Sequence, residues 1–176
     1  DADYTDTAEF MSESKEAAAE SVPMEELWNR LQQSISGWFP PEGELNTQRC
    51  AILERCMQEG ACRTPGLYTL TVPTGGGKTV ASLSFALSQA KAQGLRRVIY
   101  VIPYTSIIEQ TAQKFREILG ADCVLEHHSG LLYDIDQEAT AGSSRLVRAT
   151  ETWDIPVIVT TAVQFFESLY ACRPSQ

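Results

Sequence analysis

Residues 72–79 form a glycine-rich run, Val-Pro-Thr-Gly-Gly-Gly-Lys-Thr, whose residue types and spacing suit the binding of a phosphate chain. The glycines at 75–77 let the backbone curl so that successive N–H groups point at phosphate oxygens, a conformation that side chains would obstruct. Lys78 then places a positive charge on the β- and γ-phosphates, in the catalytic role, and Thr79 offers its hydroxyl to Mg²⁺ as the metal ligand. The predicted ATP ligands of this loop are Thr74, Gly75, Gly76, Gly77, Lys78 and Thr79.

The segments on either side of this loop have the patterns that a phosphate loop requires. Residues 67–72 are predicted to form a buried strand, and residues 80–90 repeat apolar side chains at helical spacing. The phosphates would therefore lie at a helix N-terminus, which favours an anion. A purely structural glycine-rich turn is the alternative, and the order of strand, loop and helix disfavours it.

From Thr64 onward the sequence alternates between strand and helix patterns. Strands are predicted at 97–102, 123–125 and 156–160, and helices at 108–119, 137–150 and 163–169. Continuous apolar strands separated by amphipathic helices imply a parallel sheet covered by helices on both faces. The predicted fold class is therefore α/β, a P-loop NTPase domain.

Composition and charge divide the chain into three parts. Residues 1–22 read as an acidic linker or tail, 23–60 as a helical lead-in, and 61–176 as the nucleotide-binding domain. The net charge is −9, yet residues 1–60 hold 13 acidic and 4 basic side chains, whereas the remainder holds 10 of each. Because the negative excess lies upstream of the loop, the charge neither supports nor excludes a nucleic-acid partner.

The sequence also indicates where the protein acts. It contains no transmembrane run and no signal-peptide pattern, so a cytoplasmic protein without a membrane partner is expected. Five cysteines without a C-x-x-C pair favour free thiols. A metal site built from these cysteines with His127 and His128 is disfavoured.

Two further strand ends are followed by small hydroxyl side chains, which suit a second kind of phosphate. At a helix N-terminus, such groups and the backbone N–H groups hold a nucleic-acid phosphate without reading its sequence. Thr and Ser are also common helix N-caps, so capping is the alternative. The candidate DNA-binding residues are Pro103, Tyr104, Thr105, Ser106, Thr160 and Thr161.

The carboxylates that hydrolysis requires are missing from the predicted strand ends. ATP hydrolysis needs a Mg²⁺-side carboxylate and a residue that orients the attacking water. The strand at 97–102 is followed by Pro103, the strand at 156–160 ends in Thr160, and Asp122 precedes its strand. The isolated chain is therefore expected to bind ATP without hydrolysing it. A P-loop kinase, which needs a catalytic carboxylate and a lid, is disfavoured.

Four runs of the sequence, taken in order, resemble the CRISPR-associated helicase-nuclease of type I interference systems, a superfamily 2 helicase. They are residues 71–79, 97–110, 124–129 and 149–161. The likeness covers about residues 45–176 and leans towards the type I-C branch. It implies that the α/β domain is a partial RecA-like domain, the first of the two in a helicase.

The resemblance also implies roles for matching residues. Residues 103–106 match its first DNA-backbone motif, and Thr160 and Thr161 match the later one. Residues 46–49 match an adenine-side motif, in which Gln48 or Arg49 would read the base edge. A solvated helix start is the alternative for this motif.

Two neighbouring histidines lie in one of the runs that resemble the family. Their residue types and spacing do not indicate a chemical role. His127 and His128 are therefore expected to pack or to fix a loop.

By this resemblance, the chain is expected to be a fragment of an ATP-dependent single-stranded DNA helicase or translocase in CRISPR interference. It would stop before the acidic Asp-Glu motif, with residues 1–22 closing an upstream HD nuclease domain. Its partners would be single-stranded DNA and, through the parent protein, the CRISPR surveillance complex. The alternative is a non-enzymatic truncated product with residual nucleotide or partner binding. A sheet cut in this way is expected to expose residues 157–159 on an unpaired edge strand.

Overall fold

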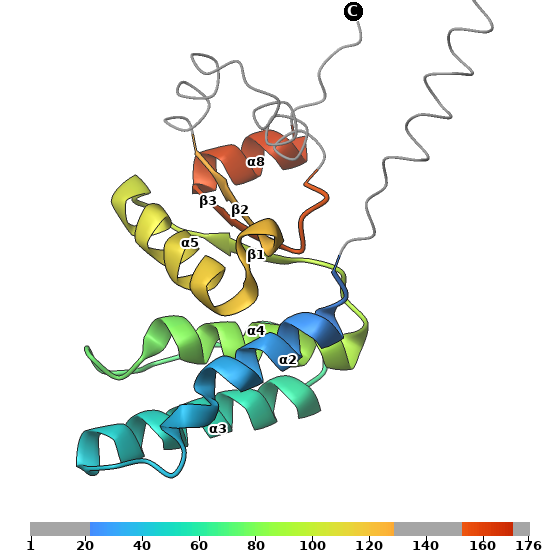
Figure 1. Ribbon diagram of the computed structural model, residues 1–176. Coiled ribbons are helices and arrows are strands. Elements are labelled where there is room, and N and C mark those ends of the chain that lie inside the picture. Colours follow the sequence, from blue (N-terminus) through green and yellow to red (C-terminus); the bar gives the residue numbers. More distant parts are fainter. Residues whose placement is uncertain (1–21, 129–152, 171–176) are drawn as a thin grey trace, which may run out of the picture.

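A computed structural model describes residues 22–128 and 153–170 of the chain (Figure 1). The helix predicted at 137–150 lies outside these residues. None of the described helices is long and apolar enough to cross a membrane. The elements, in chain order, are α2 (Met24–Ile35), the 3-10 helix η1 (Ser36–Trp38), α3 (Glu44–Cys62), α4 (Lys78–Gln93), β1 (Val98–Val101), α5 (Thr105–Leu119), the 3-10 helix η2 (Ala121–Cys123), β2 (Val124–His127), β3 (Val157–Thr160) and α8 (Ala162–Tyr170).

The three strands form one parallel sheet in the order β1-β3-β2. Val98 pairs with Val157 on one side of β3, and Val124 pairs with Val157 on the other. The strands predicted at 97–102 and 156–160 are confirmed. The third strand begins at Val124 because Cys123 still belongs to η2.

Alternate residues of the central strand enter two separate cores. Val157 and Val159 lie in the larger core, with residues of α2, α4 and α5, whereas Ile158 packs in a smaller core with Leu125 and Trp153. Figure 1 shows α8 on one side of the strands and α4, α2 and α3 on the other. The predicted fold class, a parallel sheet with helices on both faces, is confirmed.

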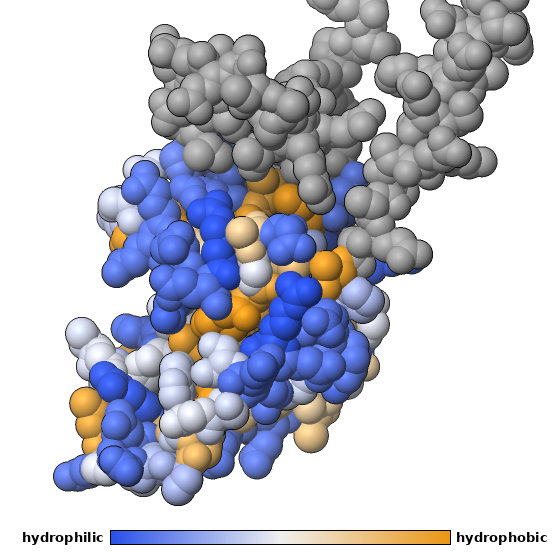
Figure 2. Space-filling view, viewed as in Figure 1, coloured by the Kyte–Doolittle hydropathy of each residue, from blue (hydrophilic) through white to orange (hydrophobic). Residues whose placement is uncertain are grey.

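The lead-in helices share the larger core with the sheet. Leu27, Leu31 and Ile35 of α2 and Leu53 of α3 are at most 2% exposed and belong to it. Their helical spacing in the sequence places them on one face, which explains why they are buried together. Figure 2 shows a largely hydrophilic surface with hydrophobic side chains in a band through the middle of the molecule.

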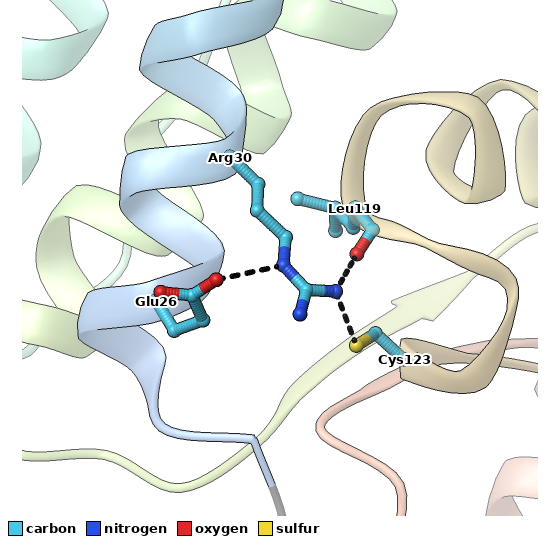
Figure 3. Close-up of polar contacts among 4 residues, drawn as sticks. All are labelled: Glu26, Arg30, Leu119 and Cys123. Atoms are coloured by element: carbon cyan, nitrogen blue, oxygen red, sulfur yellow. Dashed lines mark hydrogen bonds and ion pairs between the residues drawn. The ribbon is translucent and has the colours of Figure 1, made fainter.

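Arg30 links α2 to the end of α5 through hydrogen bonds. Its guanidinium donates to the carbonyl oxygen of Leu119 over 2.6 Å and to the Cys123 sulfur over 3.4 Å (Figure 3). Glu26, one turn earlier, accepts a hydrogen bond from Arg30 Nε. The positive charge thus meets a carbonyl in the last turn of α5, where the helix dipole favours a cation.

The strand predicted at 67–72 is not formed. Within the described residues this segment has no strand partner, and the side chains of Leu67 and Leu70 are 96% and 45% exposed. An apolar run becomes a strand only where a neighbour satisfies its backbone N–H and C=O groups, and the local pattern does not supply that neighbour.

The expectation of an exposed edge at residues 157–159 is also wrong. All three residues are fully buried, since β3 pairs on both sides and its side chains pack into the two cores. Apolar exposure falls instead on β1, where Ile99 and Val101 are 38% and 43% exposed. The strand that comes last in the described sequence lies between the two earlier ones, a crossover that chain order alone does not reveal.

Candidate functional site

The phosphate loop requires glycine at each of its three glycine positions. Gly75 and Gly77 both have φ +81°, a left-handed conformation that side chains disfavour. A Cβ on Gly76 would lie 2.6 Å from Cγ1 of Val72 and 3.0 Å from the carbonyl oxygen of Pro73. The loop therefore has the curled backbone that the sequence predicted, for two different steric reasons.

The two polar residues after the glycines are exposed where α4 begins. Lys78 opens the helix and Thr79 follows it, both facing solvent. Gly77 precedes the helix, and no side chain caps its first turn. The unpaired N–H groups, Lys78 and the helix dipole together favour an anion at this point.

A cavity of about 630 Å³ opens beside the loop, within the size range of small-molecule sites. It lies between the turn that contains Trp38, the first turns of α3 and the glycines of the loop. The sequence predicted no role for residues 37–40, three of which line the cavity. The residues around the cavity are Gly37, Trp38, Pro40, Glu42, Asn46, Arg49, Cys50, Leu53, Gly75, Gly77, Val80 and Ala81.

The two residues predicted to read the adenine base are placed differently. Gln48 is exposed and does not line the cavity, whereas Arg49 does. Arg49 Nε donates to the carbonyl oxygen of Gly75 over 2.8 Å, and its Nη1 donates to Oδ1 of Asn46 over 3.3 Å. The guanidinium therefore joins α3 directly to the phosphate loop.

The candidate DNA-binding runs differ in access. Residues 103–106 are exposed around the start of α5, and none of the described side chains caps that helix. Thr161 Oγ1 instead accepts the backbone N–H of Gln164 over 3.1 Å, so it caps α8. Thr160 is fully buried, and its hydroxyl has no hydrogen-bond partner among the described residues.

Both histidines at the end of β2 are 5% exposed. His128 Nε2 lies 2.9 Å from Oε1 of the buried Glu126, whose Oε2 accepts from Arg116 at 2.9 Å. The His127 ring meets Trp153 edge-on, with 5.8 Å between ring centroids. Burial, and then the charge of His128, lower the pKa of His127. These contacts suit the expected packing and loop-fixing roles.

Within the described residues, one group of three side chains could hold a metal ion. The ligand atoms of Glu109, Glu126 and His128 all lie within 4.8 Å of one another. Because Glu126 already bonds Arg116 and His128, its negative charge is neutralised by a salt bridge. The described cysteines are free thiols, and Cys172 lies outside the described residues.

Comparison with known proteins matches residues 25–172 to the family described as type III restriction enzyme, res subunit. The chain is also similar to the CRISPR-associated nuclease/helicase Cas3 of Haloferax volcanii. The two are 34% identical over an alignment of 173 positions, and the match covers 79% of this chain and 18% of that relative. The chain thus spans less than a fifth of the relative's length.

Proposed function

Because the chain belongs to the type III restriction enzyme res subunit family, we propose that it is the ATP-binding part of a helicase that acts in CRISPR interference. The similarity to Cas3 confirms the resemblance seen in the sequence. The observation that carries the proposal is the curled glycine loop before α4, beside a cavity of about 630 Å³.

The loop and the start of α4 fit the phosphates and the metal ion. No atom of the described residues lies within 4 Å of a Cβ built on Gly75 or Gly77, so space remains where phosphate oxygens would approach the backbone. The N–H groups that open α4 bind the oxygens, and Lys78 offsets their charge. Thr79 would hold Mg²⁺ through its hydroxyl, and the ion would supply positive charge that offsets the charge of the phosphates.

The cavity takes the base and ribose of the nucleotide. Trp38, at 43% exposed, offers an aromatic face, and Asn46 and Arg49 supply polar groups nearby. The lining combines these polar side chains with the apolar side chains of Leu53, Val80 and Ala81, a mixture that suits a ligand with both polar and apolar parts. Gln48 has no part in this cavity and keeps a base-reading role only if its side chain moves.

Single-stranded DNA is the proposed polymer substrate of the parent protein. Residues 103–106 are accessible at the uncapped N-terminus of α5, where a backbone phosphate meets free N–H groups. Thr160 and Thr161 would contribute through backbone groups, since one hydroxyl is buried and the other caps α8. The parent would join the CRISPR surveillance complex in the cytoplasm.

This chain is proposed to bind ATP without hydrolysing it. Among the residues that line the cavity, the single carboxylate is Glu42, in the turn before α3. Neither β1 nor β3 ends in an acidic residue. Nothing described here would orient an attacking water, so nucleotide binding is the activity expected of these residues.

Calorimetric titration with Mg-ATP tests the proposal. Lys78→Ala is expected to weaken binding about a hundredfold, because it removes a charge-assisted contact to the phosphates. Lys114→Ala, an exposed lysine paired with Glu117, is the matched control and should leave binding unchanged. Equal binding by the protein and Lys78→Ala would refute the site. Steady-state phosphate release that Lys78→Ala abolishes would refute the lack of hydrolysis.

A further inference from the structure

Among the described residues, Arg49 is the one side chain outside α4 that hydrogen bonds to the phosphate loop. Its Nε donates to the Gly75 carbonyl oxygen over 2.8 Å. Asn46, one turn earlier in α3, holds the same guanidinium through its Oδ1 at 3.3 Å. The backbone of Arg49 therefore belongs to α3, and its guanidinium is held against the phosphate loop.

The carbonyl that Arg49 binds belongs to a peptide unit with a second restraint. The peptide between Gly75 and Gly76 also carries the Gly76 N–H, which donates to the Pro73 carbonyl oxygen over 3.0 Å. That bond closes a turn whose third residue, Gly75, has φ +81°, as a type II turn requires. Since a peptide unit is planar, holding its oxygen also sets the direction of its N–H.

This restraint matters because glycines alone do not select one conformation. Gly75 and Gly77 populate positive and negative φ about equally, so the free loop has many backbone states. Ordering them would oppose nucleotide binding. A guanidinium that holds one peptide in place reduces that cost before the phosphates arrive.

We propose that Arg49 is a positioning residue for the triphosphate: it holds the Gly75–Gly76 peptide so that the next N–H groups, at the start of α4, face the phosphates. This inference rests on the proposed function and replaces base reading as the role of Arg49. It makes a specific claim about the ligand: affinity for the phosphate chain depends on Arg49, and the choice between bases does not.

The test compares ligands that share a phosphate chain and differ in base. The full chain and its Arg49→Ala variant are titrated with ATP, GTP and inorganic tripolyphosphate, each with Mg²⁺. Loss of a charge-assisted hydrogen bond is expected to weaken all three by a similar factor, about tenfold. Arg49→Lys keeps a donor and should recover part of the affinity. Arg55→Ala, an exposed arginine on the same helix, is the control.

The outcomes separate the two roles. Weaker ATP binding with unchanged tripolyphosphate binding would make Arg49 a base reader and overturn the proposal, as would an Arg49→Ala variant that binds every ligand normally. If the unaltered chain binds neither ATP nor tripolyphosphate, the proposed function itself fails.

Thermal melting of each variant separates folding from positioning. Because Arg49 is only half-buried and bonds no core residue, the melting temperature should stay unchanged. If Arg49→Ala lowers it, Arg49→Lys carries the comparison. Hydrogen exchange at residues 76–77 should be faster in Arg49→Ala, and unchanged exchange there would contradict the restraint.

Discussion

The phosphate loop and the ends of β2 and β3 all carry polar residues that the sequence singled out, yet they differ in access. At the loop, Lys78 and Thr79 are exposed at the first turn of a helix. At the ends of β2 and β3, His127 is 5% exposed and Thr160 is fully buried. Polar residues predicted to bind phosphate are therefore accessible at the loop and buried at the end of β3.

The difference shows that a polar residue after a strand is not by itself a ligand. At the loop, glycines remove the side chains that would cover the backbone. At the β2 and β3 ends, Trp153 packs against His127 and the central strand is covered on both faces. Access depends on what packs above the strand end.

The largest expected effect concerns two residues that pair in register, Ile158 of β3 and Ile99 of β1. Ile158→Ala should lower the free energy of unfolding by about 3 kcal/mol, because it leaves a cavity in a fully buried strand. Ile99→Ala, at a 38% exposed position, should cost less than about 1 kcal/mol. Urea denaturation measures both. Equal losses would mean that β3 is not the buried central strand.

The next effect tests the open side of the comparison. Gly76→Ala forces a Cβ to within 2.6 Å of Val72 and should weaken Mg-ATP binding by about thirtyfold, or about 2 kcal/mol. Gly66→Ala is the control, since its nearest neighbour, the Tyr68 hydroxyl, lies at 3.5 Å. Calorimetry should find the control unchanged. If Gly76→Ala binds Mg-ATP normally, the loop can accommodate a Cβ at position 76, which would contradict the steric argument.

A smaller effect is the pH dependence of stability that arises from His127, at the buried end of β2. Burial and the charge of His128 lower the pKa of His127, while Glu167 opposes them, so the unfolded chain binds this proton more tightly. Its contribution to stability is therefore complete above the ordinary value of about 6.5 and is lost as pH falls from there towards the folded-state pKa.

Denaturation curves between about pH 8 and pH 5 measure this dependence. His127→Gln should remove the part of the pH dependence of stability that this histidine contributes. A variant whose stability falls as steeply as that of the unaltered chain would show that His127 titrates normally and is accessible.

The smallest effect compares two neighbouring threonines. Thr160→Val removes a buried hydroxyl that no described residue pairs with, and it should leave stability unchanged or raise it by less than about 1 kcal/mol. Thr161→Val removes the cap of α8 and should lower stability by about 1 kcal/mol. Thermal denaturation distinguishes the two signs. A destabilising Thr160→Val would reveal a hydrogen-bonded hydroxyl.

Elements with a strong local signal were predicted well. The spacing of Leu83 and Leu87 gave α4, and the run that ends at Gly120 gave α5, whose C-cap is that glycine. In each case one helix face supplies the buried residues, so periodicity is enough. The apolar stripe of α8 also gave a helix, but Val163 and Phe166 remain 64% and 53% exposed. The periodicity of the sequence identifies the apolar face of α8, but it does not show which segment packs against that face.

The site divides in the same way. The glycine loop, Lys78 and Thr79 could be predicted from sequence because they are contiguous in the chain, and their role in binding phosphate stays a prediction. The cavity wall at Trp38 and the contact from Arg49 to Gly75 were not, since they join segments that are distant in the chain. Arg49 was singled out for the base side, and its bond to the loop required coordinates.

The sequence by itself determined the curled phosphate loop, since the conformation of Gly75 and Gly77 follows from the lack of a side chain. It also determined the helices, whose backbone hydrogen bonds are local. Only the tertiary structure decided that β3 lies between β1 and β2, that residues 67–72 lack a strand partner, and that Thr160 is buried. These outcomes depend on which distant segments meet, because strand pairing and burial need a partner that no local pattern specifies.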